Sequence, residues 1–170
     1  MEKNLNIESK LSDVLFNYSI ARKDIEELAA SVAEDSSIGI DMYTYELQIL
    51  KIISIGVCIN YLLQDSEYKA DISEKYWQSI LEFSDSVTKA TMDYSNTPVN
   101  YFDVLKKSLD FYVAKLNANQ EASEPSSVIG PAFAEKCGNI DDTHAVLLGS
   151  KMFNSVASGL KKFLGEEDLI

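Results

Sequence analysis

The chain has 170 residues, of which 46% are hydrophobic, and its 27 acidic and 15 basic residues give a formal net charge of −12 at pH 7. This length suits one domain, residues 1–170, with a core of its own. A negative surface repels phosphate backbones and so argues against a nucleic-acid partner. The first ten residues lack the apolar run of a secretory signal, and the two cysteines have no disulfide-framework spacing. We therefore expect a soluble, reduced cytoplasmic protein without disulfides.

The first predicted element is one long helix from about Ser9 to Glu34. Apolar or small residues recur there at alternating steps of three and four, which is typical of a helix with one buried face. The positions of this seam are Leu11, Val14, Tyr18, Ala21, Ile25, Leu28 and Val32. The pattern stops at residues 35–40.

The second helix, from about Met42 to Gln64 with Asp41 as its N-cap, is apolar on almost every side, so we expect it to be central and buried. Its only polar strip is formed by Thr44, Gln48 and Lys51, at positions i, i+4 and i+7. A membrane span is the competing interpretation. It is disfavoured because only 13 uncharged residues separate Lys51 from Asp65, and spanning requires roughly 18.

Four more helices are expected. They run from about residue 71 to 94, opened by an Asp71-x-x-Glu74 capping box, from 97 to 119, from 128 to 137, and from 142 to 164 with an N-cap at Asp141 or Asp142. Gly149 inside the last helix indicates a close helix crossing. Residues 120–127 read as a surface loop, and residues 1–8 and 165–170 as ends that fray. The prediction is an all-α, antiparallel bundle of about five long helices plus one short helix, with the second helix in the centre.

The sequence does not contain the residues of familiar catalytic motifs in the number or at the positions that these motifs require. His144 is the only histidine, so it cannot complete a di-iron or zinc-protease motif. Cys58 lies within an apolar helix and Cys137 near a helix end that disfavours a thiolate, so both are expected to be structural. Gly149-Ser150-Lys151 resembles the end of a P-loop, but the glycine required five positions earlier is His144.

Two carboxylate pairs lie one helical turn apart, Asp24 with Glu27 and Glu82 with Asp85. Four carboxylates facing one another could hold Mg²⁺ for phosphate hydrolysis. The spacing loosely resembles the ExxE and ExxD pairs of all-helical nucleotide pyrophosphohydrolases, although the first pair begins with aspartate and the apolar helix separates the two. Because 27 of the residues are acidic, a solvated face is the favoured interpretation. No catalytic residue and no cofactor are assigned.

Aromatic residues are the remaining candidates for a binding function, and the chain contains nine tyrosines, seven phenylalanines and one tryptophan. Their ordinary role is core packing. Because helical faces are abundant and catalytic groups are scarce, we expect a non-enzymatic, acidic interaction or regulatory module that binds a protein partner or forms a homo-oligomer. The alternatives are an aromatic-lined pocket for a small molecule and the Mg²⁺-dependent phosphate hydrolase. Neither nucleic acid nor a membrane is an expected partner.

Overall fold

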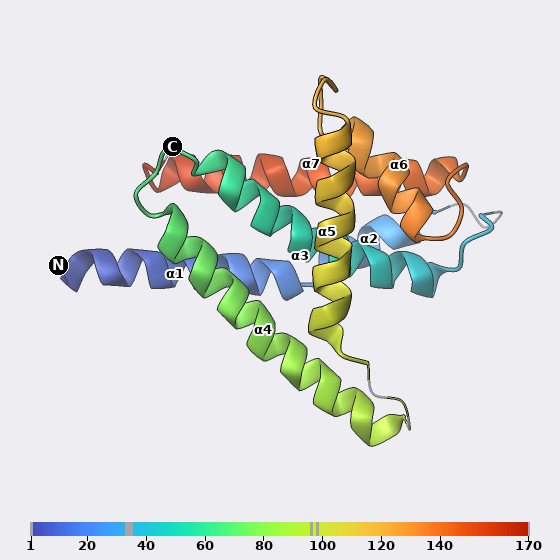
Figure 1. Cartoon of the computed structure of the whole chain (residues 1–170), viewed down its shortest axis with the longest axis horizontal. Coiled ribbons are helices and arrows are strands. Elements are labelled where there is room, and N and C mark those ends of the chain that lie inside the picture. The colour runs from blue at the N-terminus through green and yellow to red at the C-terminus, as the bar shows by residue number, and fades with distance from the viewer. Residues whose placement is uncertain (1, 33–35, 96, 98, 170) are drawn as a thin grey trace.

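Figure 1 shows the computed structural model, which describes residues 2–32, 36–95, 97 and 99–169, with side chains from Glu8 onward. Within these ranges the regular structure is entirely helical, which confirms the predicted all-α bundle. The helices are α1 (Glu2–Ile20), α2 (Lys23–Ala30), α3 (Ile40–Leu62), α4 (Lys69–Tyr94), α5 (Tyr101–Ala118), α6 (Ser126–Lys136) and α7 (Thr143–Glu166). Helix α1 thus begins before residue 9, and α7 extends to residue 166.

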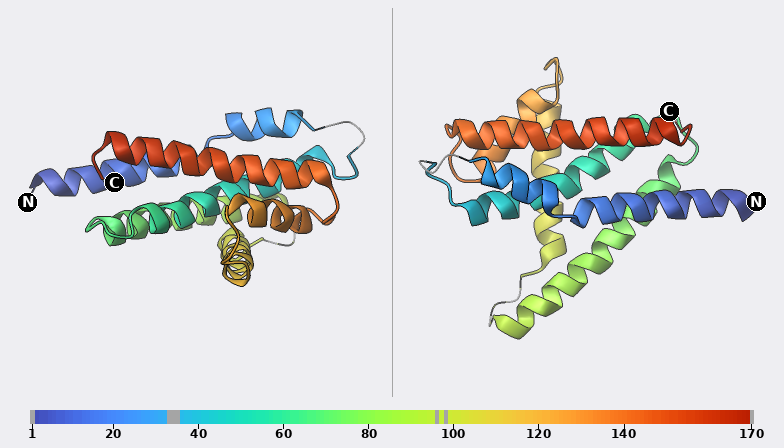
Figure 2. Two further views of the ribbon diagram at one scale, coloured as in Figure 1. Left: turned by 90° about the horizontal axis from the view of Figure 1, so that it is seen from above. Right: turned by 180° about the vertical axis from the view of Figure 1, so that it is seen from behind.

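Helix α3 lies at the centre of the bundle, as its composition predicts. It packs against all six other helices. Seen from above, α1, α2 and α7 lie on one side of it and α5 and α6 on the other, while α5 runs across the direction of α7 (Figure 2, left). Among the described helices, α3 alone is long and apolar enough for a membrane span, but 72% of its apolar window is buried inside the protein.

The expected first helix is two helices, and this prediction was wrong. The chain leaves the helix at Ala21 and Arg22, and α2 starts at Lys23. The polar strip of α3 satisfies the carbonyl groups at this break: Gln48 Nε2 donates to the Ser19 carbonyl at 2.6 Å, and Lys51 Nζ donates to the Ala21 carbonyl at 2.9 Å. A helix end needs such donors, because its last carbonyls have no partner within the helix.

The break also changes which face of the first segment is buried. Leu11 is buried as predicted, but Val14 is 47% exposed and Leu15 takes its place at 1%. Beyond the break, Ile25 and Ala29 are buried. A two-residue interruption turns the second helix relative to the first, so one continuous seam cannot describe both. Residues 33 and 34 of the expected helix lie outside the described residues.

Aspartates were predicted at the starts of three helices, and one of these three starts is correct. Asp142 caps α7, because its Oδ1 accepts a 2.9 Å hydrogen bond from the Ala145 N–H. Asp41 does not cap α3, whose N-cap is Gly39. Asp71 does not open a capping box either, since α4 already begins at Lys69.

Glycines allow close approach at two helix pairs. A Cβ atom added at Gly149 in α7 would lie 2.5 Å from the Cβ atom of Phe133 in α6. This contact confirms the close crossing expected from Gly149. At Gly56 in α3, an added Cβ would collide with the indole of Trp77, so the glycine provides the space in which α4 lays its tryptophan against the central helix.

Candidate interaction site

A largely apolar groove of about 790 Å³ lies where α4 diverges from the N-terminal half of α3. In Figure 1 the C-terminal half of α4 leaves the body of the bundle at the lower right. We call this hollow the α3/α4 groove. It is lined by Ile20, Arg22, Asp41, Thr44, Tyr45, Gln48, Phe83, Val87, Thr91, Val99 and Tyr101.

Helix α4 supplies one wall through side chains at positions i, i+4 and i+8, namely Phe83, Val87 and Thr91. Residues at this spacing share one face of a helix. Tyr94 follows on the same face one turn later, and it is 93% exposed. The apolar face of α4 therefore continues past the point where other helices cover it, and it ends as an exposed stripe that runs from Phe83 to Tyr94.

Aromatic rings form the floor of the groove and hold its shape. The ring of Phe83 meets those of Phe16 and Tyr101 edge to face, each with centroids 6.2 Å apart. The start of α5 is tied to α4 by a 3.1 Å hydrogen bond from the Tyr101 N–H to Thr88 Oγ1. Burial raises the pKa of Tyr101 to about 12, so its hydroxyl stays neutral. The floor is therefore preorganised, while Tyr45 and Val99 on the rim are 43% and 47% exposed.

The structure does not bring the two predicted carboxylate pairs together. Asp24 and Glu27 lie on α2, Glu82 and Asp85 lie on α4, and these two helices make no contact. Asp24 Oδ1 instead accepts a 2.8 Å hydrogen bond from Lys51, and Glu82 accepts one from Gln78 at 3.0 Å. Within the described ranges, no group of three or more acidic, histidine or cysteine side chains is placed to hold a metal ion.

The burial of Lys51, which pairs with Asp24, was not predicted from the sequence. The Lys51 side chain has no exposed surface, and Asp24 is 33% exposed. Burial lowers the pKa of Lys51, and the hydrogen bond and charge of Asp24 offset part of that effect. The ammonium also lies 4.2 Å from the centre of the Tyr18 ring. All of these contacts join α3 to the α1–α2 break, so the lysine has a structural role.

The cysteines and the histidine do not form a nucleophilic site. Cys58 and Cys137 are free and buried, and burial raises the pKa of their thiols to about 11 and about 12. Thiols with pKa values this high carry little nucleophilic thiolate at neutral pH. His144 is half-buried in the first turn of α7.

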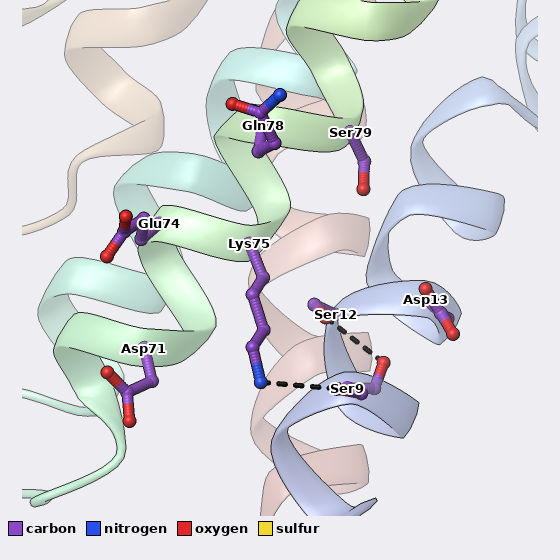
Figure 3. Close-up of a pocket in the computed structure, with 8 residues that line it drawn as sticks. All are labelled: Ser9, Ser12, Asp13, Asp71, Glu74, Lys75, Gln78 and Ser79. Atoms are coloured by element: carbon purple, nitrogen blue, oxygen red, sulfur yellow. Dashed lines mark hydrogen bonds between the residues drawn. The ribbon is translucent and has the colours of Figure 1, made fainter. Parts of the chain in front are cut away.

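A polar cleft of about 560 Å³ separates the middle of α1 from the N-terminal half of α4 (Figure 3). Lys75 reaches across it, with Nζ 3.2 Å from Ser9 Oγ and 3.4 Å from Glu8 Oε2. In Figure 3, Asp71 and Glu74 point away from α1. The carboxylates therefore do not converge, and the lysine already has partners, so this cleft is a weaker candidate for binding than the α3/α4 groove.

Glu46 is buried where α3 faces α5 and α6. It is 6% exposed, and its Oε2 has no hydrogen-bond partner among the described residues. The buried hydroxyls of Ser108 and Tyr112 on α5 are unpartnered in the same sense. Burial raises the pKa of Glu46, and Lys136 partly lowers it. Burial and the charge of Glu46 also raise the pKa of Tyr112.

Replacing Glu46 with glutamine should therefore stabilise the protein near neutral pH. The folded state binds a proton on Glu46 more tightly than the unfolded state, so the stability that this proton provides is lost as pH rises through the raised pKa. The advantage of Glu46→Gln should shrink as pH falls below the ordinary value of 4.5. Thermal melts near pH 7 and below pH 4.5 measure the difference in stability between the variant and the wild type. Glu82→Gln, at an exposed carboxylate, is the control, and a variant less stable than wild type near neutral pH would contradict the prediction.

Comparison of the chain with protein-family models, with curated protein sequences and with solved structures gave no match.

Proposed function

We propose that the chain is a non-enzymatic interaction module that binds a protein partner through the α3/α4 groove. The observation that carries the proposal is the apolar stripe of α4, which continues from Phe83 on the groove floor to the exposed Tyr94. Aromatic side chains contribute most to the energy of protein interfaces. Contiguous exposed apolar surface commonly marks an interaction site.

A pocket for a small apolar molecule is the second candidate. The aromatic lining favours it, and the volume of about 790 Å³ falls within the ordinary range for ligand sites. The groove is open along its rim, however, since Tyr45 and Val99 are nearly half exposed. A small molecule bound there would keep part of its surface in water, whereas a partner protein would cover the rim as well.

The proposal predicts that binding of the partner depends on Tyr45. Immobilised wild-type protein should retain a stoichiometric protein from a lysate of its source cells, and Tyr45→Lys should lose it, because the lysine places a charge on the apolar rim. Tyr61→Lys is the matched control, since Tyr61 lies on the same helix, is 74% exposed and is not among the groove residues. Quantitative mass spectrometry of the eluates measures the difference.

Two results would count against a protein partner. One is retention that is equal for Tyr45→Lys and wild type, which would place the interface elsewhere. The other is the absence of any stoichiometric protein, together with a bound small molecule in native mass spectra that Tyr45→Lys removes. That second result would favour the ligand pocket.

A further inference from the structure

We infer that the occupant of the α3/α4 groove is a basic amphipathic helix of the partner protein. This inference rests on the proposed function and adds the chemistry of the partner. It follows from three properties of the groove: its walls, its length and its charge.

The walls of the groove are helix faces. Thr44, Tyr45 and Gln48 come from α3, and Phe83 and Val87 from α4. Side chains on such faces form ridges, and a third helix can lay its own ridge between them. An amphipathic helix docks in this way through apolar anchors at positions i, i+3 or i+4, and i+7.

The length of the apolar stripe matches a short helix. From Phe83 to Tyr94 the stripe covers eleven residue steps, or about 16 Å at the helical rise of 1.5 Å per residue. About three turns of a partner helix span that distance. Both ends of the stripe present an aromatic ring, and Tyr94 at 93% exposure has the most surface left to bury.

The charge of the groove favours a basic partner. Within the lining, the base Arg22 already faces Glu26 at 3.8 Å, and the acid Asp41 is exposed. Over the length of the stripe, α4 also carries the exposed acids Asp85 and Asp93 and one exposed base, Lys89. The chain as a whole has a formal charge of −12, which steers cationic partners towards it and repels anionic ones.

The same charge argues against a second copy of the chain as the occupant. A homodimer formed through this groove would bring two molecules of charge −12 together at a surface whose lining contains the exposed acid Asp41. Like charges placed across an interface disfavour association. A helix with lysine or arginine beside its apolar face has no such cost.

The test uses synthetic peptides of about four helical turns with a fluorescent label. One carries leucine and lysine in helical periodicity, one carries leucine and glutamate in the same pattern, and one contains the leucine and lysine residues in scrambled order. Fluorescence anisotropy with the wild-type chain should show binding of the periodic leucine–lysine peptide at least about tenfold tighter than of either other peptide. Added salt should weaken the binding.

Matched variants test whether the peptide binds in the α3/α4 groove. Tyr45→Lys should lower the affinity for the leucine–lysine peptide by about tenfold or more. Tyr61→Lys adds the same charge to the same helix and should change this affinity by less than about threefold. The double variant Asp41→Asn with Asp93→Asn should also weaken binding, because it removes an exposed acid from the groove lining and another from the length of the stripe. Its control, Glu121→Gln with Glu124→Gln, removes two exposed charges from the α5–α6 connection and should have little effect.

The outcomes separate this inference from the proposed function. Equal binding of the leucine–glutamate peptide, with dependence on Tyr45, overturns the basic partner and leaves the groove as an interaction site. Equal binding of the scrambled peptide overturns the helical partner, because only charge would then be recognised. If no peptide binds but the groove-dependent protein partner is found, the inference fails alone. If Tyr45 affects neither peptide nor protein binding, both proposals fail.

Discussion

Replacing Lys51 with methionine should lower the free energy of unfolding by about 2–4 kcal/mol. The buried ammonium donates hydrogen bonds to two groups, and its removal leaves both groups without a donor. The Ala21 carbonyl loses its 2.9 Å donor and Asp24 Oδ1 its 2.8 Å donor. Asp24 is 33% exposed and water can reach it, which keeps the expected loss near the lower end for a buried pair. Urea denaturation followed by circular dichroism measures the change.

Lys23→Met is the control for this prediction. Lys23 is 90% exposed and lies 3.9 Å from Glu27, so its removal should change stability little. A Lys51→Met variant as stable as wild type would show that the apolar methionine compensates for the lost hydrogen bonds. The lysine would then not be needed to hold the α1–α2 break.

Replacing Gly149 with alanine should lower the free energy of unfolding by about 2–3 kcal/mol, although alanine is the better helix former. The added methyl group would lie 2.5 Å from Phe133 Cβ and 2.9 Å from Phe133 Cγ. Neither neighbour is the free end of a flexible side chain, so relief requires α6 and α7 to move apart. This helix pair has the most extensive contact in the bundle, and thermal or urea unfolding measures the loss.

Gly159→Ala provides a control on the same helix. An added Cβ at Gly159 meets nothing within 4 Å, so this variant should be stabilised by about 0.5–1 kcal/mol through helix propensity and reduced freedom of the unfolded chain. If both glycine variants gain stability, α6 and α7 are not in the close contact described here.

The fold class and the central helix could be predicted because they depend on composition and periodicity. Helix α3 has so little polar surface that only burial on all sides satisfies it, and the structure packs every other helix against it. Asp142 was likewise predictable as an N-cap, since an aspartate at a helix start accepts backbone hydrogen bonds locally. These features need little information about distant parts of the chain.

The α1–α2 break could not be predicted from its own residues. No proline or glycine lies at Ala21 or Arg22, and the seam on both sides of them has helical spacing. The break is stabilised by Gln48 and Lys51, which are 29 and 30 residues from the carbonyls that they satisfy. The polar strip on α3 was visible in the sequence, but its partner was not.

The candidate site likewise has some features that the sequence predicts and others that depend on the tertiary structure. By itself the sequence determined the acidic charge and most of the helices, because composition specifies the charge and helical periodicity specifies the helices. Only the tertiary structure decided that α4 diverges from α3, that Phe83 lies on a groove floor and that Tyr94 is uncovered. The physical reason is that helical periodicity shows which face needs a partner, whereas the angle at which neighbouring helices cross decides how much of that face receives one.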